Sequence, residues 1–161
     1  MARRFGWLAH AAVFVFCVSF VLPTKRDAKI AGSGLQDYLG FETAIWAVVM
    51  AVFLPIELFT HGFTDNFLIC LWGISYLVAD VGFVVAYVQL LRGRERSARG
   101  FAITASSGAV LSILYCLRGA VPLIGFWLWI ACPFVLWWIA HRNIREATTV
   151  SLAPTSERHS S

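Results

Sequence analysis

One carboxylate stands near the middle of a long apolar run, residues 74–87 (ISYLVADVGFVVAY). A charged side chain at the centre of a membrane helix costs about 2.5–3.5 kcal/mol on insertion scales, so Asp80 should face other helices rather than lipid. On a helix of about 3.6 residues per turn, Tyr76 and Tyr87 share a face with Asp80. These three residues are therefore candidates for a proton relay, a cation site or a contact to a polar ligand.

The alternative for Asp80 is a structural role. A neutral aspartic acid can form an interhelical hydrogen bond, which contributes about 0.6 kcal/mol on average inside a membrane. No lysine or arginine lies at a comparable depth in the apolar blocks to hold a charged carboxylate. We favour the structural role and keep the relay or ligand role as the competing hypothesis.

A second pattern lies in the apolar block 101–117. Four small residues follow the i, i+3, i+4, i+7 spacing that lets two helix backbones approach closely in a membrane: Ala105, Gly108, Ala109 and Ser112. We interpret them as a helix-packing face. The sequence thus favours a small polytopic membrane protein that packs with itself, as a homo-oligomer, or with a larger membrane complex through this face.

Glu57, His61 and Asp65 are spaced four apart and could share one helix face. Carboxylates and imidazole both bind divalent ions. Gly62 interrupts that face, however, and no cysteine or second histidine is close in sequence. We expect a solvated helix end with a Glu57–His61 pair, and the sequence predicts neither a metal site nor another cofactor.

The remaining function classes find little support in the residues. No nucleophile and base, and no metal set, occur in a pattern typical of catalysis, so an enzyme is the least favoured class. Lysines and arginines stand at the ends of the apolar blocks rather than along a stripe, which argues against a nucleic-acid partner. A small transporter, or a protein that binds a hydrophobic ligand through Asp80, is the main alternative.

The elements that must position these residues follow from composition. Hydrophobic residues make up 59% of the 161-residue chain and charged residues 14%, against about 45–50% and about 25% in soluble domains. The hydrophobic residues form five blocks, whose lengths are close to the roughly 20 residues that a spanning helix needs. The blocks are 5–23, 41–59, 66–91, 101–117 and 121–140. We predict an all-α integral membrane bundle of five transmembrane helices over residues 1–141. Residues 142–161, rich in Ser and Thr, are predicted to be a disordered cytoplasmic tail.

The second block leaves an alternative open, because Pro55 interrupts it and acids stand at its ends. In that alternative four helices span and the second segment is re-entrant. Five spans place ten lysines and arginines on one side and three on the other, whereas four spans place nine against four. The positive-inside rule puts the arginine-rich segment 92–99 and the C-terminus in the cytoplasm in both cases and leaves the side of the N-terminus open.

Three short motifs carry a resemblance: FVLP at 20–23, LGFETAIWAV at 39–48 and IGFWLWIA at 124–131. In these motifs the chain resembles small uncharacterised bacterial multi-span inner-membrane proteins. That resemblance implies a bacterial inner (plasma) membrane and no particular activity. In length and tryptophan content the chain also resembles the tryptophan-rich sensory/translocator family. The first-loop motif of that family, however, has no counterpart in residues 24–40 of this chain.

Overall fold

The computed structural model describes residues 6–28, 35–60, 65–116 and 121–151. Five helices occur in this part of the chain: α1 (Gly6–Ser19), α2 (Gly40–Thr60), α3 (Asp65–Leu91), α4 (Glu95–Cys116) and α5 (Ile124–Ser151). Three short strands accompany them: β1 (Pro23–Ala28), β2 (Leu35–Leu39) and β3 (Val121–Pro122). The predominantly helical class predicted from the sequence is confirmed.

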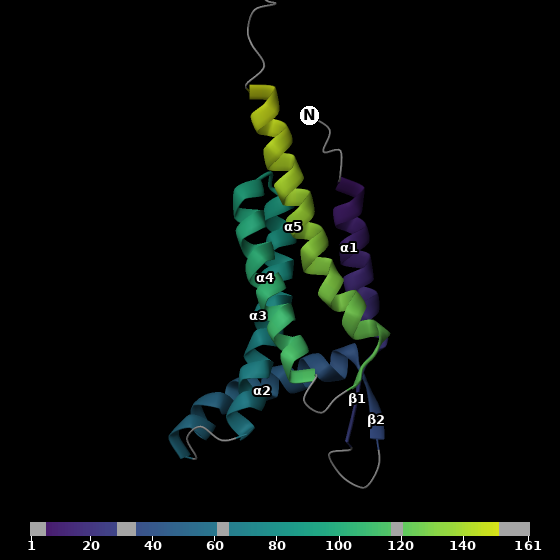
Figure 1. Cartoon of the computed structure of the whole chain (residues 1–161), viewed down its shortest axis with the longest axis vertical. Helices are drawn as coiled ribbons and strands as arrows, with labels where there is room; N and C mark the ends of the chain where they lie inside the picture. Colours follow the sequence, from purple (N-terminus) through teal and green to yellow (C-terminus); the bar gives the residue numbers. More distant parts are fainter. Residues whose placement is uncertain (1–5, 29–34, 61–64, 117–120, 152–161) are drawn as a thin grey trace, which may run out of the picture.

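Helices α1, α3, α4 and α5 run side by side as an upright bundle (Figure 1). A tight turn joins α3 to α4, and Gly93 there has a φ of 74°, a left-handed conformation that glycine adopts without steric cost. Helix α5 packs against both α1 and α4, so the first and the last described helices belong to one bundle. Alanines and aromatic side chains fill the space between these helices.

Three helices are long and apolar enough to cross a membrane, over Cys70–Leu91, Glu95–Leu114 and Ile124–Thr149. Two apolar helical segments are shorter, Gly6–Ser19 and Gly40–Phe53. The described chain therefore has the composition and helix lengths of a membrane protein. Its helices do not by themselves establish five spans.

Helix α2 lies across one end of the bundle instead of standing in it (Figure 1). It begins directly after β2, and a Cβ on Gly40 would lie 2.3 Å from the carbonyl oxygen of Ser19, so its start is held against the end of α1. Farther along, a Cβ on Gly73 of α3 would lie 2.6 Å from the carbonyl oxygen of Ala47. Helix α2 is therefore constrained at two places: it follows β2 without a linker, and its backbone contacts α3. These two constraints hold it across the bundle rather than parallel to the other helices.

The three short strands are a difference from the all-α prediction, which contains helices alone. Strands β1 and β2 form an antiparallel hairpin, and β3 pairs with β1 to give the order β2-β1-β3. The hydroxyl of Thr24 links this sheet to α2: it donates to the carbonyl of Tyr38 in β2 at 3.1 Å and lies 2.8 Å from the hydroxyl of Thr43 on α2.

Helix α5 is longer than predicted. It continues through Ser151, so residues 142–151 of the predicted disordered tail are helical. The hydroxyls of Thr148 and Thr149 donate to the carbonyls of Ile144 and Arg145 in the preceding turn, at 2.9 and 2.7 Å. These bonds let polar threonine side chains be accommodated within the helix. Residues 152–161 lie outside the described residues.

Candidate functional site

The carboxylate of Asp80 is held by a tryptophan from α5. The indole nitrogen Nε1 of Trp129 donates a hydrogen bond to Oδ1 of Asp80 at 2.7 Å. The same indole stacks on Tyr76, with ring centroids 4.2 Å apart and an angle of 9° between the planes. Tyr76 and Trp129 are buried, whereas Asp80 is half-buried.

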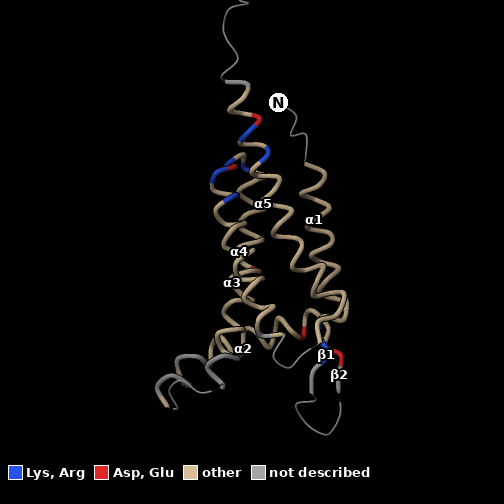
Figure 2. Tube along the Cα trace, in the orientation of Figure 1, with Lys and Arg blue, Asp and Glu red and all other residues tan. Residues whose placement is uncertain are grey.

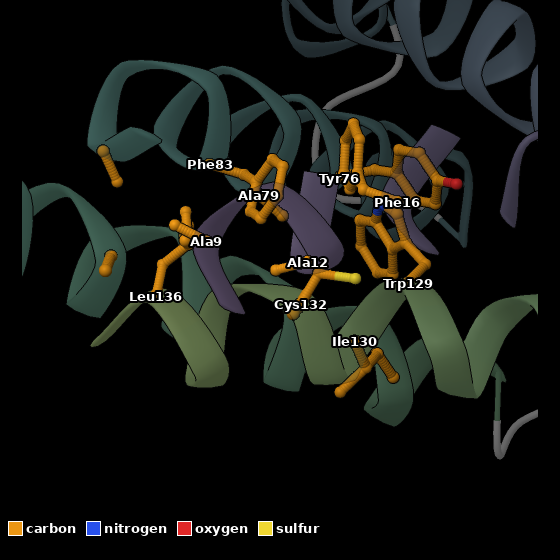
Figure 3. Packing of buried hydrophobic residues seen from close by; sticks show 14 of the residues in the cluster. Ala9, Ala12, Phe16, Tyr76, Ala79, Phe83, Trp129, Ile130, Cys132 and Leu136 are labelled. Carbon is orange, nitrogen blue, oxygen red and sulfur yellow. The ribbon is translucent and has the colours of Figure 1, made fainter. Parts of the chain in front are cut away.

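Helical spacing explains this arrangement. Tyr76 and Asp80 are one turn apart on α3, so both side chains reach one indole on α5. Figure 3 shows Tyr76 and Trp129 in the packed region that also contains Phe16 of α1 and Phe83 of α3. The latter two rings stack with centroids 4.2 Å apart. The Asp80 site therefore lies where three upright helices meet.

Tyr87 shares the helix face of Asp80 but belongs to another contact. Its hydroxyl is hydrogen-bonded to Nδ1 of His10 on α1 at 2.7 Å. Seven residues of helix separate Asp80 from Tyr87, about 10 Å along the axis. The structure thus brings Tyr76 and Asp80 together around Trp129 and places Tyr87 in a separate link between α1 and α3.

Sequence reasoning missed Trp129 as the partner of Asp80. The chain has seven tryptophans, and the sequence does not distinguish Trp129 from the others as a partner of Asp80. No spacing links positions 49 residues apart. The only available signal was chemical: an indole N–H is a donor without acceptor capacity, which suits a buried carboxylate oxygen.

The small residues of α4 are buried within the chain, against α3. A Cβ on Gly108 would lie 2.5 Å from the carbonyl oxygen of Ser75, and the hydroxyls of Ser75 and Ser112 are 3.2 Å apart. Gly82 of α3 faces Ala105 in the same way, at 3.1 Å from its would-be Cβ. Ala109 is also fully buried. This face therefore packs helix α4 against α3 within the chain, and it is not free for a second copy or a partner in this structure.

The possible metal group cannot be placed. His61 lies outside the described residues, and Glu57 and Asp65 have only their backbones described, in α2 and α3. Within the described chain, no three His, Cys, Asp or Glu side chains gather as metal ligands would.

Comparisons with known proteins give no match to this chain, whether to a protein-family model, a curated protein or a solved structure. Any functional proposal must therefore be built on the contacts of the chain itself.

Proposed function

We propose that this chain is a small, non-enzymatic, polytopic protein of a bacterial inner membrane that associates with itself or with a membrane partner through α2. The observation that carries this proposal is an apolar stripe on α2 that no described part of the chain covers. Its members recur at intervals of three or four residues, as on one helix face, and are 45–65% exposed: Phe41, Ile45, Val48, Val52 and Ile56.

This stripe lies on the side of α2 that faces away from α3. The contact with α3 uses Ala47, Met50 and Ala51, which approach Gly73. On the helical wheel the mean direction of those residues is roughly 125° away from that of Val48 and Val52. Since α3 occupies the small-residue face of α4, α2 offers the apolar surface that stands apart from the upright bundle.

The membrane arrangement that fits this surface has four spans. In it α1, α3, α4 and α5 cross the bilayer, and α2 lies along the outer surface. The alternative considered from the sequence also has four spans, but its second segment is re-entrant. Helix α1 has 14 residues, so the bilayer would thin locally around it. Figure 2 shows blue segments gathered where α3 turns into α4 and along the end of α5, which supports a cytoplasmic location for that end and for the C-terminus.

Site-specific photo-cross-linking in native membranes tests the association. A photoreactive residue at Val52 should give a discrete cross-linked protein band. The matched control is Leu114, which is 60% exposed on α4 and should contact lipid. Single-protomer bands at both positions would contradict the proposal, and a band at Leu114 alone would move the contact to α4.

Asp80 favours one second candidate, a small transporter or a protein that binds a hydrophobic ligand. The carboxylate is half-buried near the middle of α3, and Trp129 is its hydrogen-bond donor among the described residues. One oxygen is therefore left for a proton or a polar ligand group. Asp80→Asn separates this candidate from the structural role, because a carboxamide can still accept the indole hydrogen bond but cannot exchange a proton near neutral pH.

A further inference from the structure

A wide groove opens at the arginine-rich end of the bundle. It lies between the α3–α4 turn and the last turns of α5 and has a volume of about 780 Å³. Charged and polar side chains line much of it: Arg94, Glu95, Arg96, Ser97, Asn143 and Thr148. The first turn of α4 also faces it, and the free N–H groups of a helix N-terminus favour an anion.

A second groove follows the same two helices toward the middle of the bundle. Its volume is about 570 Å³, and it lies between α4 and α5. Apolar groups and two serines line it: Ile103, Ser106, Ser107, Val110, Phe134 and Trp137. The hydroxyl of Ser107 is bonded to the carbonyl of Ile103 at 3.0 Å, and that of Ser106 to the carbonyl of Ala102 at 2.8 Å. Because these hydroxyls already donate within α4, the groove suits an apolar occupant.

The two grooves lie along one face of the helix pair. Arg96 and Ile103 are seven residues apart on α4, and Trp137 and Ile144 are seven apart on α5, so each pair lies on one side of its helix. The distance from Ser97 to Ile103 along α4 is about 9 Å. Gly100 stands in this interval, and a Cβ there would meet nothing within 4 Å. Open space at Gly100 therefore lies between the polar groove and the apolar one.

The charge at this end is not neutralised within the described chain. Six arginines stand there: Arg92, Arg94, Arg96, Arg99, Arg142 and Arg145. The acids near them are Glu95 and Glu146. Neither Arg94 nor Arg96 forms an ion pair among the described residues, whereas Arg26 pairs with Asp37 in the hairpin of β1 and β2. An anion from outside the protein would thus find Arg94 and Arg96 without a carboxylate partner among the described residues.

We propose that this face binds one anionic phospholipid, with its phosphate between Arg94 and Arg96 and one acyl chain in the α4–α5 groove. The glycerol region would pass Gly100. Arginine pairs with phosphate through two parallel N–H donors, which gives the headgroup a defined seat. The inference rests on the membrane location of the chain and is independent of the proposed association through α2.

Lipid retention by the purified full-length protein tests this site. Native mass spectrometry would measure binding of phosphatidylglycerol and, separately, of phosphatidylcholine. Wild type should retain the anionic lipid preferentially. Arg94→Gln/Arg96→Gln should weaken its binding about thirtyfold, because each arginine near an anionic headgroup contributes roughly a fivefold factor. Gly100→Leu should also weaken binding, because its side chain would project into the open space at Gly100, where a Cβ meets no protein atom within 4 Å.

The matched control is Arg92→Gln/Arg145→Gln, which removes two charges from the same end but leaves the lining of the groove intact. It should change lipid binding by less than about threefold, because salt screens the attraction between the lipid phosphate and arginines that do not contact it. Equal losses in the two double variants would overturn the proposed site in favour of a diffuse charge effect. Equal retention of both lipids by wild type, or unaltered binding by Gly100→Leu, would overturn it as well. Size-exclusion profiles identical to wild type show that each variant is folded.

Discussion

At the scale of single residues, Trp129 determines what Asp80 can do. Its indole N–H holds one carboxylate oxygen, and its ring is fixed in turn by stacking on Tyr76. A carboxylate held in this way links α3 to α5 whether or not it ever exchanges a proton. The structural role and the relay role therefore differ in a single property, the need for an ionisable group.

Asp80→Asn tests that property. The carboxamide oxygen can accept the same indole hydrogen bond, but a carboxamide cannot exchange a proton near neutral pH. If the role is structural, membrane abundance, melting temperature and any knockout phenotype should be those of wild type. A knockout phenotype that Asp80→Asn fails to rescue, at equal membrane abundance, would favour the relay or ligand role instead.

Removing the hydrogen bond itself should have a small, measurable cost. Trp129→Phe keeps an aromatic ring against Tyr76 but loses the donor, and Asp80→Leu loses the acceptor. Each should lower the free energy of unfolding in detergent by about 1 kcal/mol or less through the lost bond. In the double variant the two losses should not add, because both remove the same bond. Full additivity would show that the 2.7 Å contact contributes nothing to stability.

The sequence predicted part of this site. The free-energy cost of a charged side chain inside a membrane predicts that Asp80 faces other helices. The spacing of residues on a helix predicts that Tyr76 lies beside it. Neither argument could identify Trp129, because contacts between distant segments depend on how α5 packs against α3. Tyr87 shows the limit of the same argument, since it shares the face of Asp80 and yet bonds to His10 of α1.

At the scale of elements, α3 and α4 are held together by backbone approach at glycine. Gly108→Ala should place a Cβ 2.5 Å from the Ser75 carbonyl oxygen, which is backbone and cannot rotate away. We expect the free energy of unfolding to fall by about 1–3 kcal/mol, typical of an overpacked interface. Thermal unfolding in detergent measures it.

Gly100→Ala provides the matched control on the same helix. Its Cβ would meet nothing within 4 Å, so the gain in helix propensity should stabilise the protein by about 0.5–1 kcal/mol. If Gly108→Ala raised the melting temperature as Gly100→Ala is expected to do, the close α3–α4 contact would be refuted.

The hairpin provides a pH-dependent element outside the bundle. The guanidinium of Arg26 bonds to Asp37 at 2.6 and 3.0 Å, and this hydrogen bond lowers the pKa of the Asp37 carboxyl below its ordinary value of 3.8. A lowered pKa means that the pair stabilises the folded state fully above pH 3.8 and loses this effect as the pH falls through the folded-state pKa.

Arg26→Gln should therefore speed amide exchange in β1 and β2 relative to wild type at pH 5–7. The difference between the two proteins should shrink as the pH falls below about 4. Hydrogen–deuterium exchange measures it after correction for intrinsic exchange rates, and Asp37→Asn should reproduce the Arg26→Gln profile. A difference that persists unchanged at pH 2–3 would show that the ion pair is not its cause.

Helix positions along the chain were predicted well because apolar blocks are long and separated by polar segments. The directions of these helices in space could not be predicted in the same way. Block 41–59 was predicted to be a helix, and α2 is one, but the contacts of Gly40 with Ser19 and of Gly73 with Ala47 decide that it lies across the bundle. Such contacts involve backbone atoms, which a hydrophobic pattern does not reveal.

At the scale of the whole molecule, the fold places the arginine-rich turn and the end of α5 at one end and the hairpin at the other (Figure 2). Helix α1 descends from the arginine end to the hairpin (Figure 1). With α2 lying across the bundle, the chain reaches α3 without another upright crossing. The four-span arrangement then gives the N-terminus, the turn at 92–99 and the C-terminus one common side.

Reporter fusions distinguish this arrangement from five spans. In both, a cytoplasm-active reporter at Arg96 or after Ser151 should be active, in line with the positive-inside rule. The N-terminus and the hairpin differ: four spans place the N-terminus inside and Arg26 outside, whereas five spans reverse both. An impermeant thiol reagent applied to intact cells should therefore label Arg26→Cys and leave Arg96→Cys unlabelled until the cells are opened. Cys17 is exposed in the isolated chain, so both variants are built in a Cys17→Ser background. Labelling of Arg96→Cys in intact cells, or protection of Arg26→Cys there, would refute the four-span arrangement and with it the outer location of α2.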